Sequence, residues 1–304
     1  MSVLIVGSIG IDSVKTPFGE ASDVLGGSAV YASVSSSFFN KAFIISVVGS
    51  DFPDEYMELL KSYEIDITGV EKIPGQTFRW KGYYTYELNE AKTLETQLNV
   101  LSEFDPVLPD SYRNLQDPHI FLANIDPDLQ IKVLDQIKNP ELVVLDTMNY
   151  WIENKPESLK EAMSKVDVMV LNDGEARELT GEPNLVKAST KIRELGPKRV
   201  IIKKGEHGAL MFSDDSIFSA PAYPLEFIFD PTGAGDTFAG GLIGYLSDVH
   251  GNKEEDYRKA VIFGSAMASF VVEDFSLERM KILTWDDIKE RYYQFKTLSH
   301  FELI

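Results

Sequence analysis

Short apolar runs recur along the chain, and stretches with helical periodicity separate most of them. The first run, Val3–Val6, has the length of a strand and stops at Gly7. An apolar run without alternation is typical of a strand that is buried on both faces of a parallel sheet. Five more runs of this kind lie at residues 43–48, 120–123, 142–145, 168–171 and 200–202.

Amphipathic stretches of helical length follow most of these runs. Strands that alternate with helices predict a mostly parallel sheet with right-handed crossovers and helices on both faces. We therefore expect one α/β domain over residues 1–304. The stretches lie at 54–62, 128–138, 157–165, 185–195, 235–247, 254–272 and 284–295.

Two segments, about 11–25 and 70–101, interrupt this rhythm. The second contains the alternating stretch Phe78-Arg-Trp80-Lys-Gly-Tyr83 and is rich in aromatic and β-branched residues. Such a pattern predicts antiparallel strands with one covered face. We expect the two segments to form a small β lid on the α/β domain. Three interpretations of its aromatic face stay open: the core of the lid, a cover over the substrate, or the contact of a homodimer.

Composition narrows the range of partners and compartments. The chain carries 29 basic and 48 acidic residues, a net charge of −19, which repels nucleic-acid phosphates and the anionic face of a membrane. No stretch approaches the roughly 20 apolar residues of a membrane span, and the N-terminus does not resemble a signal peptide. The absence of cysteine excludes disulfides and zinc-thiolate sites. We expect a cytoplasmic protein with a small-molecule substrate, and neither nucleic acid nor membrane as a partner.

A glycine turn carries the most specific chemical signal: Asp230-Pro-Thr-Gly233-Ala234-Gly235-Asp236, between a short strand and a helix. The glycines let the backbone approach a bound group, and the unpaired amides of the first helical turn point at it with the positive end of the helix dipole. This anion hole suits a phosphoryl group, and Asp236 could accept the proton of a substrate hydroxyl. An alternative stays open, because an aspartate at a helix start is often only a cap.

Two other nucleotide-binding motifs do not fit. The chain has no Gly-x-x-x-x-Gly-Lys-Ser/Thr sequence, so it is not a P-loop protein. The residues after the first strand, Gly7-Ser-Ile-Gly10, do not supply the glycine fingerprint of a dinucleotide-binding fold.

In contrast, the chain resembles the ribokinase-like, or PfkB-type, carbohydrate kinases in five motifs that follow one order. Residues 230–238, Asp-Pro-Thr-Gly-Ala-Gly-Asp-Thr-Phe, are similar to the C-terminal signature of that family almost letter for letter. The resemblance spans nearly the whole chain and implies the ribokinase-like three-layer sandwich with a small β lid. The other motifs are Gly7-Ser-Ile-Gly-Ile-Asp12, Leu25-Gly26-Gly27-Ser-Ala, Asn172-Asp-Gly-Glu175 and Val200-Ile-Ile-Lys203-Lys-Gly205-Glu-His-Gly208.

The resemblance implies a substrate site at Asp12, Gly26 and Gly27. In the family, the aspartate binds substrate hydroxyls, and the di-glycine leads into the helix beneath the substrate. A cap at Asp12 and a plain turn at the glycines are the alternatives. Tyr31 stands where an asparagine commonly contacts the sugar, so the identity of the substrate does not carry over. Further candidate contacts, each with a structural role as its alternative, are Arg79, Trp80, Tyr83, Asn99 and Asn124.

The resemblance places Asn172 and Glu175 near magnesium and the nucleotide phosphates. One amide and one carboxylate suit a magnesium ion that keeps several waters. Taken alone, the pair is more often an N-cap with a first-turn glutamate. Gly205 and Gly208 would form a turn beside the nucleotide. Asp230 would belong to a loop for a monovalent cation such as K⁺, with a strand-end cap as the alternative.

Lys203 and Ser265 are the remaining nucleotide-side candidates. Lys203 stands where a threonine or serine is usual beside the phosphates, so it either contacts a phosphate as a point charge or faces solvent. Ser265 lies in a late stretch rich in small residues, which suits packing beside an adenine or against another helix.

We therefore expect an ATP-dependent kinase that transfers the γ-phosphate of magnesium-ATP to a hydroxyl of a sugar or sugar-like substrate, with Asp236 as the catalytic base. A nucleoside kinase of the same fold is one alternative. A catalytically silent, sugar-binding regulatory protein is another, against which the intact Asp236 and the Asn172/Glu175 pair argue. These residues do not distinguish ATP from ADP as the donor.

Overall fold

The six predicted strands belong to one nine-stranded sheet in the computed structural model, which describes residues 2–214 and 216–302. The strand order is β13-β12-β11-β10-β9-β8-β1-β4-β5, and all neighbours from β11 to β5 are parallel. The predicted mostly parallel sheet is confirmed. The strands are β1 (Val3–Val6), β4 (Ala42–Gly49), β5 (Asp66–Ile73), β8 (His119–Leu122), β9 (Leu142–Asp146), β10 (Val168–Asn172), β11 (Arg199–Lys203), β12 (Ala209–Phe212) and β13 (Ile217–Ala220).

Three strands of this sheet were not predicted. β5 and β13 lie at its two edges and bury few of their residues, so neither has a continuous apolar run. β12 follows β11 after a turn that is too short for a crossover, and it therefore pairs with β11 in the antiparallel direction.

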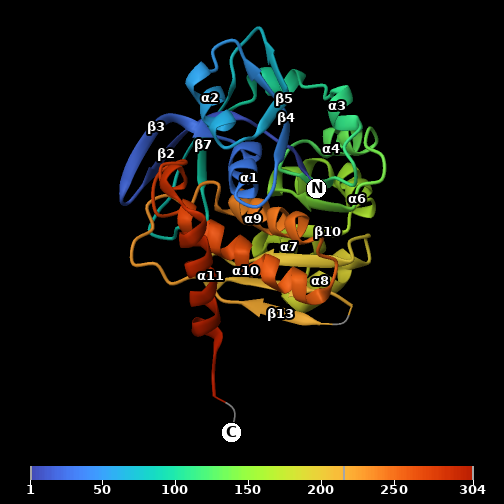
Figure 1. Ribbon diagram of the computed structural model, residues 1–304, viewed down its shortest axis with the longest axis vertical. Helices are drawn as coiled ribbons and strands as arrows, with labels where there is room; N and C mark the ends of the chain where they lie inside the picture. Colours follow the sequence, from blue (N-terminus) through green and yellow to red (C-terminus); the bar gives the residue numbers. More distant parts are fainter. Residues whose placement is uncertain (1, 215, 303–304) are drawn as a thin grey trace.

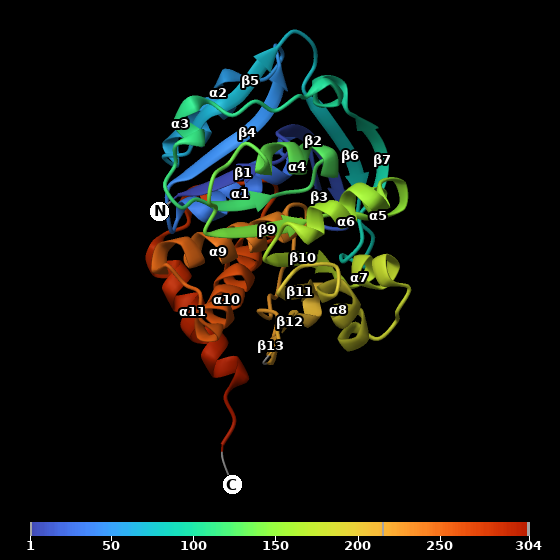
Figure 2. The ribbon, with the colours of Figure 1, turned by 90° about the vertical axis from the view of Figure 1, so that its right-hand side faces the viewer.

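Helices cover both faces of the large sheet, which gives three layers (Figures 1 and 2). Successive strand residues point to opposite faces. Ile5 and Val170 join a hydrophobic cluster with α1, α9, α10 and α11. Val6 and Leu171 join a second cluster with α4, α6, α7 and α8. The helices are α1 (Ser28–Ser37), α2 (Asp54–Ser62), α3 (Asp110–Arg113), α4 (Pro127–Leu134), α5 (Asn149–Asn154), α6 (Pro156–Ser164), α7 (Asp173–Thr180), α8 (Leu185–Arg193), α9 (Ala234–Val249), α10 (Glu254–Val271) and α11 (Trp285–Ser299).

The seven stretches predicted as helices are all helical, with ends that differ by a few residues. Within residues 2–214 and 216–302, none of the helices has the length and apolar character that a membrane crossing requires.

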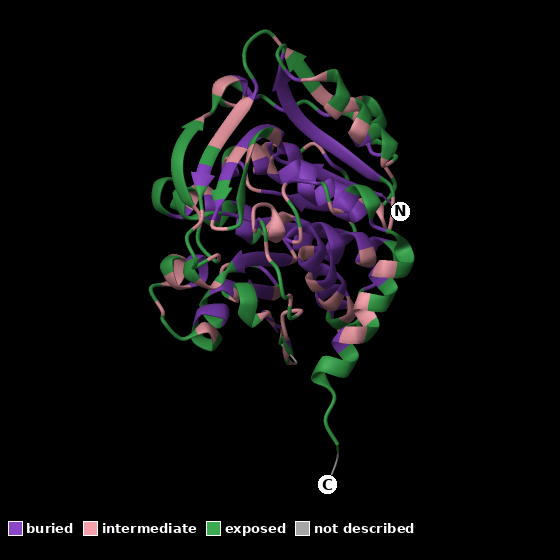
Figure 3. Ribbon diagram, turned by 90° about the vertical axis from the view of Figure 1, so that its left-hand side faces the viewer, coloured by how far each residue is buried: buried purple, intermediate pink, exposed green. Residues whose placement is uncertain are grey.

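A separate four-stranded sheet flanks the large one, in the order β3-β2-β6-β7. Some residues of the predicted lid segments lie outside this sheet. Residues 70–73 end β5 of the large sheet, and residues 99–101 lie in a 3₁₀ turn. The predicted antiparallel pairing is only partly right, since the central pair β2–β6 is parallel. Figure 3 shows much of this sheet exposed, in contrast to the buried inner strands of the large sheet. Its strands are β2 (Gly10–Thr16), β3 (Gly19–Gly26), β6 (Phe78–Tyr83) and β7 (Lys92–Gln97).

The action of the small sheet as a lid on one domain stays a prediction, and so does a homodimer formed through it. Its exposed apolar side chains include Phe18, Tyr86 and Leu94.

The topology brings several strand ends to one edge of the large sheet. From β1 the chain first builds β4 and β5 on one side and then returns to β8 on the other. Open parallel sheets bind ligands at such a switch point, outside the carboxyl ends of the strands. The adjacent strands β9, β10 and β11 end at this edge with Asp146, Asn172 and Lys203.

The turn that starts α1 requires a glycine at position 27, and this requirement can be tested. This residue has φ 102°, and an added Cβ would lie 2.4 Å from the carbonyl oxygen of Ser8. Gly181, which ends α7 at φ 63°, has nothing within 4 Å of an added Cβ. We expect Gly27→Ala to lower the free energy of unfolding by about 3 kcal/mol and Gly181→Ala by about 1 kcal/mol, because only the first adds a clash to backbone strain. Urea unfolding followed by circular dichroism measures both, and equal losses would contradict this account.

Candidate active site

The turn before α9 presents backbone amides at the start of a 16-residue helix. Gly233 caps the helix with φ 74°, and the amide of Ala234 donates to the Pro231 carbonyl at 3.1 Å. Among the described residues, no backbone carbonyl accepts a hydrogen bond from the amides of Gly235 and Asp236. Two donors at the positive end of a helix dipole suit this turn to an anion.

Lys203, at the end of β11, lies beside the same turn. A Cβ added to Gly235 would be 2.8 Å from Nζ of Lys203. The ammonium donates to Oδ2 of Asp146 at 3.1 Å. Burial alone would lower the pKa of this lysine, but the carboxylates of Asp146, Glu175 and Asp236 raise it. One ammonium thus stands with three carboxylates.

These carboxylates have perturbed protonation. Burial raises the pKa of Asp236 to about 7, with a further contribution from the charge of Asp146 and opposition from Lys203. Burial and the charge of Asp146 also raise the pKa of Glu175 to about 7. Asp236 keeps partial contact with solvent. A carboxylate with a pKa near the operating pH is suited to general base catalysis, and such shifts cluster at functional sites.

Asn172 and Glu175 form a capping box at the start of α7. The backbone amide of Asn172 donates to the Glu175 carboxylate at 2.7 Å, and the backbone amide of Glu175 donates to Oδ1 of Asn172 at 2.8 Å. The capping alternative is therefore real for both residues. It does not explain why the Glu175 carboxylate is buried within reach of the charges of Asp146 and Asp236.

Asp12 lies on β2 with its side chain 5% exposed. Burial raises its pKa to about 7, and the charges of Asp230 and Asp236 add to the shift, whereas a hydrogen bond from the Gly27 amide opposes it. A Cβ on Gly26 would lie 1.9 Å from Oδ2 of Asp12, so the carboxylate occupies space that only glycine leaves free. The structure brings Asp12 and the di-glycine to the turn before α9.

Tyr31, on α1, supports this turn from below. Its side chain is 2% exposed, and its ring would be 2.4 Å from a Cβ on Gly233. Burial and the nearby carboxylates, that of Asp12 foremost, raise the pKa of its hydroxyl. Tyr31 is thus part of the candidate site, at the position where the family's asparagine was expected.

The connection between β6 and β7 reaches the candidate site from the small sheet. The Tyr84 hydroxyl and Oγ1 of Thr232 lie 3.4 Å apart. The Glu206 amide, in the turn after β11, donates to Oδ1 of Asn89 at 3.4 Å. Neither Tyr84 nor Asn89 was among the residues predicted from the sequence. Tyr84 lies next to the alternating aromatic stretch, whereas Asn89 carries no sequence signal.

Other predicted substrate contacts make bonds inside the scaffold instead. Arg79 pairs with Asp23 and Asp51 at 2.8 and 3.3 Å. Trp80 covers Gly82 and donates to Thr93 at 3.2 Å, and Tyr83 follows it on β6 with 37% exposure. Asn99 donates to the Thr77 carbonyl at 2.9 Å, and Asn124 accepts from the Trp151 indole at 2.9 Å. Their roles as substrate contacts stay predictions.

The remaining nucleotide-side candidates have local structural roles as well. Gly205 and Gly208 close the turn after β11 with positive φ values of 53° and 81°. Ser265 lies on α10, which packs closely against α9 where Gly264 meets Gly241. Asp230 caps its own turn by accepting from the Thr232 amide at 2.9 Å. A monovalent cation at Asp230 stays a prediction.

Comparison with known families shows where these features belong. A family model described as pfkB family carbohydrate kinase matches residues 11–281.

The chain belongs to the pfkB family of carbohydrate kinases.

Individual relatives of this pfkB protein are sugar and nucleoside kinases. The cytidine kinase of Thermococcus kodakarensis is 31% identical over 252 residues, which cover 81% of this chain and 88% of that protein. The deoxyribokinase of Salmonella typhimurium is 26% identical over 268 residues, which cover 79% and 80%. An aminoimidazole riboside kinase from Salmonella enterica, solved with aminoimidazole riboside and an ATP analog, shares the fold with a TM-score of 0.79 at 17% identity, over 96% of this chain and 100% of that one. The predicted ribokinase-like fold is confirmed, and the protein is a sugar or nucleoside kinase.

The donors around the turn also fit the magnesium ion that a kinase of this family is expected to use. Mg²⁺ at phosphoryl-transfer sites is usually held by one or two carboxylates together with phosphates and waters. Asp146 and Glu175 supply two carboxylates whose pKa values are raised by burial, and a cation would offset that cost. The described residues contain no group of three or more His, Cys, Asp or Glu that could hold a metal alone. The expected ion therefore suits joint binding with a nucleotide.

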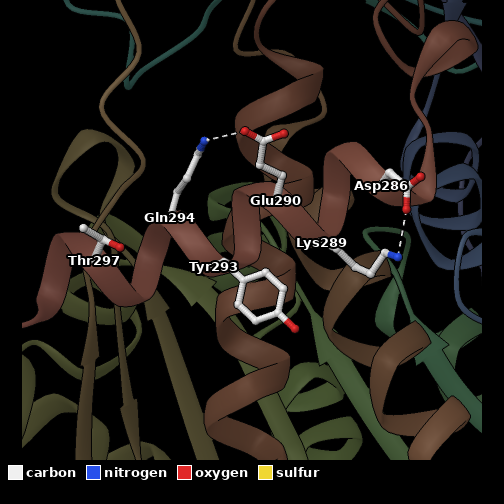
Figure 4. A pocket seen from close by; sticks show the side chains of 6 residues that line it. All are labelled: Asp286, Lys289, Glu290, Tyr293, Gln294 and Thr297. Atoms are coloured by element: carbon white, nitrogen blue, oxygen red, sulfur yellow. Dashed lines mark hydrogen bonds and ion pairs between the residues drawn. The ribbon is translucent and has the colours of Figure 1, made fainter.

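A hollow of about 520 Å³ on α11 is not part of this site (Figure 4). It lies along one face of a single helix, between Asp286 and Thr297. Lys289 pairs with Asp286 at 2.8 Å, and Gln294 donates to Glu290 at 3.3 Å. The buried carboxylates lie elsewhere, so this hollow offers no comparable chemistry.

Asp146 belongs to the candidate site but was not predicted from the sequence. It follows the apolar run 142–145 directly, as a strand-end carboxylate at the sheet edge where ligands bind. The signal was present, but no motif drew attention to it.

The raised pKa of Asp12 predicts how stability changes with pH. A carboxyl with a folded-state pKa of about 7 keeps its proton in the folded state while the unfolded chain loses it, so this group lowers stability as the pH rises from about 4 to 7. We expect Asp12→Asn to raise the free energy of unfolding by about 4 kcal/mol at pH 8 and by less than about 1 kcal/mol at pH 4. Urea titrations at both pH values measure these free energies of unfolding. Asp248→Asn, at an exposed position, is the control for the change of charge. A gain that is the same at both pH values would contradict the assignment.

Proposed function

We propose that this protein transfers the γ-phosphoryl group of ATP to a hydroxyl of a nucleoside, with Asp236 as the general base. The observation that carries the proposal is the convergence of Asp236, the amides of residues 235 and 236, and Asp12 on one turn. Among the described residues, no backbone carbonyl accepts a hydrogen bond from these two amides. A nucleoside is favoured as acceptor because the cytidine kinase is more similar to this chain than the deoxyribokinase is.

The acceptor binds on the side of Asp12. Its buried carboxylate can accept hydrogen bonds from two neighbouring hydroxyls of a ribose. Gly26 and Gly27 allow the sugar to approach the backbone beside it. Tyr31 packs against Gly233 and so supports the turn before α9. The charges of Asp12 and Asp236 interact, and the acceptor hydroxyl lies between these two carboxylates.

Phosphoryl transfer takes place at the start of α9. The acceptor oxygen attacks the γ-phosphorus, the bond to the ADP oxygen breaks, and the hydroxyl proton passes to the Asp236 carboxylate. The amides of Gly235 and Asp236 donate to the oxygens of the transferring group and stabilise its charge. A pKa of about 7 leaves a large fraction of Asp236 ionised at neutral pH and ready to accept this proton.

The nucleotide binds on the side of β10 and β11. Asn172 and Glu175 face its phosphates, and the turn of Gly205 and Gly208 lies beside it. Magnesium, when bound with ATP, would neutralise phosphate charge next to Glu175 and Asp146. The small sheet covers the site through Tyr84 and Asn89 and excludes water during transfer.

A ligand panel tests the acceptor class. Thermal unfolding in saturating cytidine, other nucleosides, ribose, deoxyribose, fructose and inositol reports which compound binds the folded state. We expect a nucleoside at 100 times its Kd to raise Tm by roughly 5 °C, because it adds about 2.7 kcal/mol of stability. A shift with free sugars alone would favour a sugar kinase, the activity that the deoxyribokinase relative supports.

The substitution Asp236→Asn tests the general base. It keeps the shape and the hydrogen-bonding oxygen but cannot take up a proton, so we expect kcat to fall by about 10²- to 10⁴-fold with little change in KM. A coupled assay for ADP, with the nucleoside that gives the largest thermal shift, measures both constants. Asp248→Asn, exposed near the other end of α9, is the matched control and should retain full activity. Near wild-type turnover by Asp236→Asn would remove Asp236 from this role.

A further inference from the structure

We infer that Lys203 contacts the γ-phosphoryl group directly during transfer, and that Asp146 is the positioning residue that holds Lys203 for this contact. The inference rests on the proposed function, because it concerns the same transfer step. It adds a protein cation to the anion hole and gives a role to a carboxylate that no sequence motif includes.

The location of Lys203 carries the first part. Its Nζ lies against the Cα of Gly235, where an added Cβ would come within 2.8 Å. Gly235 and Asp236 are the residues whose amides lack a backbone carbonyl partner among the described residues. A phosphoryl group that accepts hydrogen bonds from these amides would therefore have the ammonium as its neighbour. Gly235 thus has two reasons to be glycine: close approach of the backbone to the phosphoryl group, and room for Lys203.

The hydrogen bonds of Lys203 leave capacity for this contact. An ammonium has three donors, and within the described residues the hydrogen bond to Asp146 is the one that its Nζ makes. Its side chain is 18% exposed, so the free donors are held within a mostly buried site. They can donate to phosphoryl oxygens without a change in the bond to Asp146.

Asp146 is itself fixed on both sides. Its Oδ1 accepts from the Thr147 amide at 2.8 Å, while Oδ2 accepts from Lys203 at 3.1 Å. Its carbonyl accepts from Gln130 at 3.1 Å, and the same amide group donates to the Ala123 carbonyl at 2.9 Å. The carboxylate therefore has little freedom, and it sets the position of the ammonium.

A structural role alone explains this ion pair poorly. Removing two charges from water costs about as much as their attraction returns, so a buried ion pair seldom stabilises a fold more than apolar side chains would. The pair also lies at the edge where the strands of the sheet end, and the charges of Glu175 and Asp236 reach it. These features favour a function in binding and transfer.

Nucleotide binding tests the contact without any acceptor. Isothermal titration calorimetry compares a non-hydrolysable ATP analog with ADP, both with magnesium, on wild type and Lys203→Met. We expect affinity for the analog to fall about 10-fold or more and affinity for ADP to change less than about 2-fold, because only the analog has a γ-phosphoryl group. The exposed Lys187→Met, on α8, is the control for the change of charge and should bind both ligands as wild type does. An equal loss for both ligands, or no loss for either, would overturn the contact.

Kinetics of a double-mutant cycle test the role of Asp146. We expect kcat to fall about 10²- to 10³-fold in Lys203→Met and to recover in part in Lys203→Arg, which restores the charge. If Asp146 acts through Lys203, Asp146→Asn combined with Lys203→Met should be no slower than Lys203→Met alone. The double variant removes both charges, so it avoids leaving the Asp146 carboxylate buried without its partner. Wild-type kcat in the double variant would show that the pair only balances charge, and would overturn the inference.

The two proposals fail in different ways. If wild type phosphorylates none of the nucleosides, the proposed acceptor is wrong, whereas the difference between analog and ADP binding still decides the role of Lys203. If wild type is active and Lys203→Met matches it in both assays, the inference about Lys203 fails and the proposed function stands.

Discussion

The candidate site depends on one electrostatic constraint: three buried or partly buried carboxylates share a single ammonium. Asp146, Glu175 and Asp236 lie close enough for their charges to interact, and Lys203 opposes their repulsion. Carboxylates that leave water beside each other gain protons, which explains why two of them have pKa values near 7. Because desolvation and mutual repulsion destabilise the ionised carboxylates, a bound cation or a transferred proton that neutralises them stabilises this edge of the sheet.

The topology explains how these groups meet. Asn172 and Lys203 are register partners, and Asp146 is level with Val170, two residues before Asn172. The three side chains therefore arrive at one edge from three consecutive strands of the sheet. The N-terminus of α9 brings Asp236 to the same place, with Gly235 packed against Lys203. β2 carries Asp12 in from the small sheet. Each element supplies only one or two of these groups, so the chemistry depends on the packing of helices against the sheet.

Sequence alone predicted those parts of the fold that leave a local pattern. Strands buried on both faces have continuous apolar runs, and all six were found. Edge strands such as β5 and β13 bury few residues, so they leave no such run. The parallel pairing of β2 with β6 joins residues more than 60 positions apart, such as Asp12 and Trp80, which local alternation cannot reveal. The same limit applies to the contact between Asn89 and the turn after β11.

For the site, motifs identified the residues but not their partners. Asp12, Tyr31, Lys203 and Asp236 lie together as their order in the chain suggested. Arg79 and Asn99 were chosen as polar residues near a lid, yet in the structure they bond to the scaffold itself. Asp146 was not predicted because a single aspartate at a strand end is a weak signal. Its partner, Lys203, lies two strands away in the sheet, and the sequence does not reveal that contact.

A crystal structure of the protein with its nucleoside, ADP, magnesium and aluminium fluoride, which mimics the transferring phosphoryl group, tests the proposed geometry of transfer. We predict that fluorine atoms lie within about 3 Å of the Gly235 and Asp236 amides, and that an acceptor hydroxyl lies within the same distance of the Asp236 carboxylate. Aluminium fluoride bound away from the start of α9, or a hydroxyl that Asp236 does not reach, would contradict transfer at this turn with Asp236 as the base.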